Sequence, residues 1–181
     1  EQVTMSCRVG FRSRKTSLSA LGTYSLFARE LGKRGVFVTF LSTNLVFDGA
    51  TPNIHWATAM NPKTVYGTLK AKAEIGMKDS LEKFAIIRIS KVVSKEMTLL
   101  NTWMRKLDGG ITIHPFSDYR CAPIDLQTTI KGIARVTLNH LSGIWQFSPE
   151  DDVAYSDIAL EVARQKKVDL NLVESIESAS R

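Results

Sequence analysis

Short continuous runs of apolar residues alternate along the chain with longer segments in which apolar residues recur every three or four positions. Two of the runs, 36–41 and 84–89, are rich in β-branched and aromatic side chains, as is typical of strands buried on both faces of a parallel sheet. The helical spacing covers 17–33, which Gly35 would end, and 63–82. This order of helix, strand, loop, helix and strand predicts an α/β fold with a doubly wound parallel sheet.

After residue 94 the predicted elements become shorter and more mixed. We expect helices at 97–107, 125–140 and 156–166, strands at 111–113 and 144–147, and a polar tail to residue 181 that is loose at its end. This change of character divides the chain into residues 1–93, which hold the main sheet, and residues 94–181, a smaller α/β lobe.

The composition is that of a folded globular protein, with 44% hydrophobic and 23% charged residues. No apolar run reaches the roughly 18 residues that a membrane span needs, and the start shows no signal-peptide pattern. We therefore expect a soluble, cytoplasmic protein without a membrane partner. Cys7 and Cys121 lie far apart and have no metal-type spacing, so we expect two free thiols and no metal site.

The positive charge is concentrated at the start of the chain. The net charge is +6, and the first 40 residues carry seven Lys or Arg against two Glu. A basic stretch can bind nucleic acid, but residues 8–15 contain one aromatic residue, Phe11, and no recognisable motif. We expect a solvated or phosphate-facing surface and no nucleic-acid partner; binding of nucleic acid through 8–15 is kept as an alternative.

Tyr66 and Lys70 form the strongest local chemical signal. Residues four apart on a helix share one face, so the ammonium would lie beside the phenol. A neighbouring positive charge stabilises the phenolate and lowers the pKa of the phenol, and the pair could then exchange a proton with a substrate oxygen. An exposed helix pair without a chemical role is the simpler alternative.

Ser42 and Thr43 stand where the first predicted strand ends. Ligands of open α/β sheets bind at the carboxyl ends of the strands, and a hydroxyl there can hold a carbonyl oxygen as it gains charge. The following loop leads through Pro62 into the helix of Tyr66. Three proton-donating groups could therefore meet in one crevice, although a hydroxyl pair at a loop start is common in itself.

Several segments together resemble the extended short-chain dehydrogenases/reductases, and most closely their dTDP-4-dehydrorhamnose reductase branch. They are 41–49, 62–70, 87–90, 117–124, 142–148 and 153–159. The resemblance extends over about residues 17–166. It implies the C-terminal part of a Rossmann-like doubly wound sheet with a smaller α/β lobe that binds a sugar nucleotide.

The resemblance also implies a reaction. This would be the NADPH- or NADH-dependent reduction of a nucleotide-linked 4-keto sugar, as in deoxysugar and dTDP-rhamnose biosynthesis. Tyr66 would donate a proton to the keto oxygen, Lys70 would lower its pKa and bind the nicotinamide ribose, and Thr43 would bind the substrate oxygen. A homodimer is carried as a candidate assembly.

Further site residues follow from the same resemblance. Those expected at the cofactor, besides Tyr66 and Lys70, are Ser42, Arg88 and Ser90. Those expected at the substrate, besides Thr43, are Asn44, Val46, Phe47 and Arg120, the last facing the nucleotide phosphates; a surface salt bridge is the alternative for Arg120.

The sequence departs from the family pattern at its start. The family opens with a strand and a glycine-rich turn that cradles the cofactor pyrophosphate, whereas the G-x-x-G here, 32–35, would close a helix. We therefore expect the chain to correspond to the later half of the cofactor domain plus the substrate lobe. A second hypothesis is a non-catalytic regulatory subunit that binds a sugar nucleotide or cofactor on the same fold.

Overall fold

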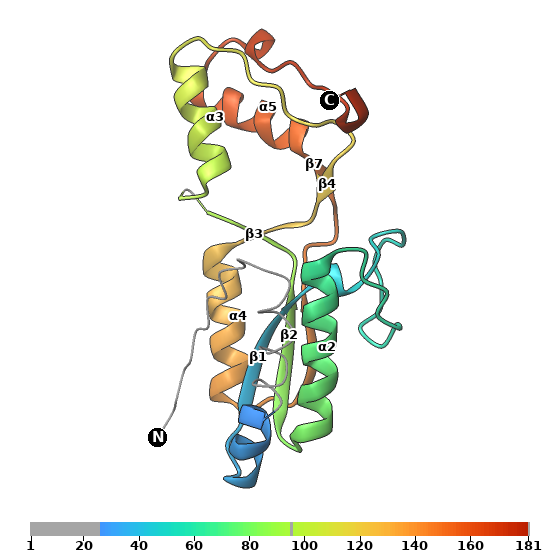
Figure 1. Cartoon of the computed structure of the whole chain (residues 1–181). Coiled ribbons are helices and arrows are strands. Elements are labelled where there is room, and N and C mark those ends of the chain that lie inside the picture. Colours follow the sequence, from blue (N-terminus) through green and yellow to red (C-terminus); the bar gives the residue numbers. More distant parts are fainter. Residues whose placement is uncertain (1–25, 95, 181) are drawn as a thin grey trace.

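Three parallel strands form the main sheet of the protein (Figure 1). The computed structural model describes residues 26–94 and 96–180. The strand order is β1 (Val38–Thr43), β2 (Phe84–Ile89) and β6 (Gly143–Phe147), so β2 is central. The expected α/β fold with a parallel sheet is confirmed. Strand β1 begins two residues later than predicted and is only partly buried, whereas β2 has the predicted bounds and a buried interior.

The two faces of this sheet are covered by different helices. Helix α2 (Val65–Ser80) packs through Met77 against Ile86 of β2, and Figure 1 shows α4 (Leu126–Leu138) on the opposite side. Val136 of α4 packs with Ala85 and Ile87, which alternate with Ile86 along β2. Side chains of β2 that lie on the same face as Ile86 therefore point toward α2.

Local sequence explains where the helices begin and end. Thr64 caps α2 by accepting a hydrogen bond from the backbone amide of Gly67 at 2.9 Å, and Asp125 caps α4 in the same way. The helical residues 26–33 end before Gly35, whose φ of 66° lies in the left-handed region that glycine adopts readily.

A second layer lies beyond the carboxyl ends of the strands. Helices α3 (Thr98–Asp108) and α5 (Tyr155–Lys166) pack around Trp103, Leu107 and Ile113. Two short strand pairs connect the layers, as Figure 1 shows. They are the parallel pair β3 (Lys91–Val93) and β5 (Pro123–Asp125) and the antiparallel pair β4 (Arg120–Cys121) and β7 (Val153–Ala154).

Two expectations for the C-terminal half need correction. The predicted lobe 94–181 includes residues 126–147, but α4 and β6 belong to the main sheet layer. The predicted strand 111–113 is reduced to one bridge between Ile113 and Val173. The tail is attached as far as Ser178, whose amide and hydroxyl donate to the Asp118 carboxylate. We call residues 168–180 the C-terminal strap; it includes η2 (Leu170–Leu172) and η3 (Ser178–Ser180).

The basic segment 8–15 and Cys7 lie outside the described residues. Among the residues that the structure describes, Cys121 is a free thiol, and burial raises its pKa. The helices of this part of the chain include none that is long and apolar enough to cross a bilayer.

Candidate active site

Gly67 allows the first turn of α2 to approach the end of β1. A Cβ atom at this position would lie 2.1 Å from the carbonyl oxygen of Leu45, which belongs to η1 (Asn44–Val46) directly after β1. Only a residue without a side chain permits this contact. The close approach brings Tyr66, the preceding residue, to the carboxyl edge of the sheet with 45% of its surface exposed.

Lys70 lies one turn further along the same face of α2. Its ammonium donates a hydrogen bond to the carbonyl oxygen of Leu41 at 2.8 Å. It also lies 4.7 Å from the ring centroid of Phe40 and 5.8 Å from that of Tyr66. The ammonium is therefore held between the end of β1 and the phenol ring.

The phenol of Tyr66 is partly buried. Burial raises the pKa of Tyr66 above its ordinary value. The stabilisation of the phenolate by Lys70 stays a prediction. A raised pKa keeps the phenol protonated at neutral pH, which is the form that can donate a proton.

Thr43 and the four residues after it follow β1 at the carboxyl edge of the sheet. The Thr43 hydroxyl accepts a hydrogen bond from the Leu45 amide at 3.2 Å and caps η1. Val46 and Phe47 are buried in a cluster with Ala71 of α2, so both serve packing, whereas Asn44 is exposed. Of these predicted substrate residues, Thr43 and Asn44 carry the polar groups.

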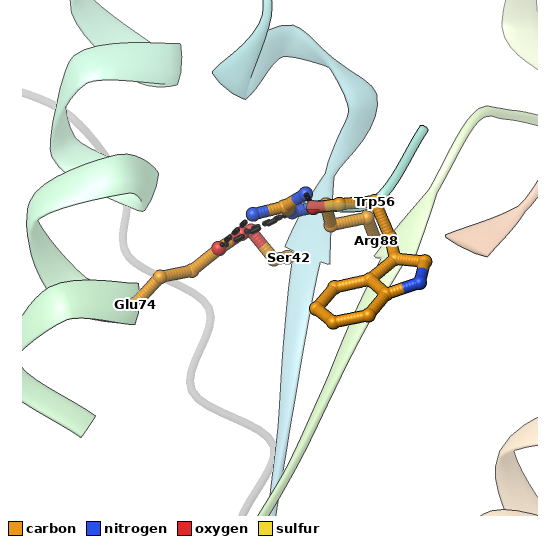
Figure 2. A network of polar contacts seen from close by, with 4 residues as sticks. All are labelled: Ser42, Trp56, Glu74 and Arg88. Atoms are coloured by element: carbon orange, nitrogen blue, oxygen red, sulfur yellow. Dashed lines mark hydrogen bonds and ion pairs between the residues drawn. The ribbon is translucent and has the colours of Figure 1, made fainter. Parts of the chain in front are cut away.

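A buried polar network links Glu74 of α2 with Ser42 of β1 and Arg88 of β2 (Figure 2). The Glu74 carboxylate is fully buried and accepts hydrogen bonds from the Ser42 hydroxyl at 2.6 Å and from Arg88 Nη2 at 2.7 Å. Arg88 is 2% exposed, and its Nη1 donates to the carbonyl oxygen of Trp56 at 2.8 Å. The Phe47 ring centroid lies 4.8 Å from the guanidinium carbon.

Glu74 is the residue that sequence reasoning missed. It follows Lys70 by four positions and Tyr66 by eight, so the three residues share one face of α2. A carboxylate in line with a Tyr–Lys pair, together with an arginine inside an otherwise apolar strand, was the available signal. The side chains of Ser42 and Arg88, expected at the cofactor, are both engaged by Glu74.

Ser90 and Arg120 occupy different places. Ser90 follows β2 at the carboxyl edge, and its hydroxyl oxygen is buried without a hydrogen-bond partner among the described residues. Arg120 is exposed on β4 in the connecting region, where its Nη2 donates to the carbonyl oxygen of Asp152 at 2.5 Å. The sheet edge thus brings together the predicted residues other than Arg120.

The chain matches the model of a known protein family. A family model described as the RmlD substrate binding domain matches residues 12–181. The chain belongs to this family. The search of curated protein sequences found no match to this chain.

Solved structures share its fold. A dTDP-4-dehydrorhamnose reductase from Clostridium acetobutylicum superposes with a TM-score of 0.79 at 19% identity, covering 92% of this chain and 61% of that one. The corresponding Bacillus anthracis enzyme, in complex with NADP, gives 0.78 at 19% identity with the same coverage. The Bordetella bronchiseptica enzyme WbmG, in complex with NAD and UDP, gives 0.77 at 17% identity, covering 94% and 59%. The chain therefore spans about three fifths of the length of these structures.

Proposed function

We propose that the protein is an NADPH- or NADH-dependent reductase of a nucleotide-linked 4-keto sugar. The observation that carries the proposal is the meeting of Tyr66, Lys70 and Thr43 at the carboxyl edge of a parallel sheet. Membership of the RmlD substrate binding domain family and the dTDP-4-dehydrorhamnose reductases that share the fold support it.

The residues at this edge fit a nicotinamide cofactor. The Ser90 hydroxyl is a buried polar atom that a bound group could satisfy, and the Lys70 ammonium can bind ribose hydroxyls. We propose that Lys70, Tyr66 and Ser90 hold the nicotinamide end. When bound, such a cofactor supplies the hydride for carbonyl reduction.

The other steps fall to the residues of the chain. The Tyr66 phenol, kept protonated by its raised pKa, donates its proton to the keto oxygen. The Thr43 hydroxyl donates a hydrogen bond to the same oxygen, and the Lys70 ammonium stabilises the phenolate that remains. We further propose that the layer of α3 and α5 receives the sugar nucleotide, with Arg120 at its phosphates; the homodimer stays a prediction.

The test is the rate of NADPH oxidation by the full-length protein with a dTDP-linked 4-keto sugar. We expect Tyr66→Phe to lower kcat by at least about a hundredfold while the Kd of the sugar nucleotide is retained. Thr68→Ala, which removes a hydroxyl two residues further along the helix that donates to the Thr64 carbonyl, should leave both unchanged. Full activity of Tyr66→Phe would refute the assignment. A wild-type protein that binds the nucleotide but shows no oxidation would favour the non-catalytic subunit.

A further inference from the structure

The Glu74–Arg88 ion pair joins three separate parts of the protein. Glu74 lies on α2, Arg88 lies on β2, and the carbonyl of Trp56 belongs to the long loop between β1 and α2, as Figure 2 shows. We call residues 48–62 the edge loop. The Nε and Nη2 atoms of Arg88 donate to the Glu74 carboxylate at 2.7 to 3.2 Å, while Nη1 donates to the edge loop. One planar guanidinium therefore connects the helix with the loop.

The edge loop has a second attachment beside the first. Gln146 of β6 is the register partner of Arg88, and its side-chain amide donates to the carbonyl oxygen of Ile54 at 2.8 Å. Two neighbouring strands thus hold alternate carbonyls of the loop. Within the loop, the amide of Asn61 donates to the carbonyl oxygen of Val46 at 3.0 Å and ties the loop to η1.

Helix α2 is fixed to β1 at two successive turns. Lys70 donates to the carbonyl of Leu41, and Glu74 accepts from the hydroxyl of Ser42, the next residue of β1. Buried charges are tolerated where they are paired and hydrogen-bonded, and this pair satisfies both conditions. An apolar pair would pack equally well but could not hold the loop carbonyl.

We propose that Glu74 and Arg88 are positioning residues that hold the Tyr66–Lys70 helix and the edge loop in one fixed arrangement at the carboxyl edge. The link between the helix and the edge loop follows from the geometry alone, whereas its consequence for catalysis rests on the proposed function. Arg88 acts through its fork of donors, so an ammonium cannot replace it: a lysine can pair with Glu74 but cannot also reach the Trp56 carbonyl.

The experiment measures amide hydrogen exchange and the NMR signals of ring-labelled tyrosine, the Tyr66 signal being assigned with Tyr66→Phe. Neither readout needs cofactor or sugar, so both decide this proposal even if the reductase assignment fails. In Arg88→Lys we expect the amides of Thr58 and Asn61 to exchange about tenfold faster or more, because a hydrogen bond from a charged donor is lost. The Tyr66 signal should shift in the same variant.

Two control variants separate coupling from general loosening. Gln146→Ala removes only the attachment at Ile54, so loop exchange should rise while the Tyr66 signal stays in place. Val136→Ala opens a cavity on the opposite sheet face and should lower global stability. It should change neither the exchange of the edge-loop amides nor the Tyr66 signal.

Unchanged loop exchange in a folded Arg88→Lys variant would overturn the proposal, as would faster exchange with an unmoved Tyr66 signal. If Arg88→Lys does not fold, Glu74→Met/Arg88→Met removes both buried charges together and keeps the volume. This double variant should fold with a fast-exchanging loop and a shifted Tyr66 signal. A folded double variant with a wild-type loop would refute the proposal.

Discussion

At the residue scale, the site depends on one missing side chain as much as on those present. Gly67 lets α2 touch the carbonyl of Leu45, and the contact fixes where Tyr66 stands relative to Thr43. Alanine favours helices over glycine, so helix propensity alone would make Gly67→Ala stabilising. The 2.1 Å separation of the added Cβ from a backbone oxygen reverses that sign, because backbone on both sides must shift.

We therefore expect Gly67→Ala to lower the free energy of unfolding by about 1–3 kcal/mol, the usual cost of overpacking. Urea denaturation measures the change. Thr68→Ala, at the next and partly exposed position of the same turn, should change it by less than about 0.5 kcal/mol. A Gly67→Ala protein as stable as Thr68→Ala would show that α2 does not need this close approach.

The raised pKa of Tyr66 also predicts a pH dependence of stability. The folded-state pKa exceeds that of the unfolded chain, near 10, so ionisation opposes folding. The contribution is fully present below about pH 10 and is lost as the pH rises through the folded-state pKa. Tyr66→Phe cannot ionise, so wild type should lose stability relative to this variant above about pH 10. Unfolding midpoints of the two proteins measured across that range check this, and a constant difference would contradict it.

At the scale of elements, continuous apolar runs predicted the buried strand well. The predicted bounds of 84–89 match the observed strand because β2 is central in the sheet and its four interior residues are buried. The strand predicted at 111–113 is not formed, because Ile113 makes only a single bridge to Val173 of the C-terminal strap. Pairing over long sequence separations, such as Asp118 with Ser178, leaves no local pattern to detect. Glu74 escaped notice for the same reason, because its partners lie on two strands.

The C-terminal strap should be held by a carboxylate that acid releases. Hydrogen bonds from the Ser178 hydroxyl and amide lower the pKa of Asp118 below its ordinary value. Attachment is therefore complete above the unfolded-state pKa, about 4, and is lost as the pH falls through the lowered folded-state pKa. NMR shifts of the Ser178 amide should follow this titration in wild type and not in Asp118→Asn. A Ser178 amide insensitive to acid in wild type would contradict the assignment.

At the scale of the whole molecule, the protein consists of a sheet layer that carries acid–base groups and a helical layer beyond the strand ends (Figure 1). The presence of two layers could be anticipated from the change of pattern after residue 94. The path of the chain between the layers could not. The chain returns to the sheet through α4 and β6 before entering α5, and only pairing of β6 with β2 reveals this. The chain therefore passes between the layers three times, through β3, then through β4 and β5, and finally through β7.

The central claim is that this edge supports hydride reduction of a sugar carbonyl. Its most direct test uses a nicotinamide cofactor labelled with deuterium at the transferable position, the full-length protein and a dTDP-linked 4-keto sugar. We predict deuterium at C4 of the product sugar for wild type, and at least about a hundredfold slower incorporation for Tyr66→Phe. Absence of deuterium at C4 in the wild-type product, or equal incorporation by Tyr66→Phe, would contradict the account.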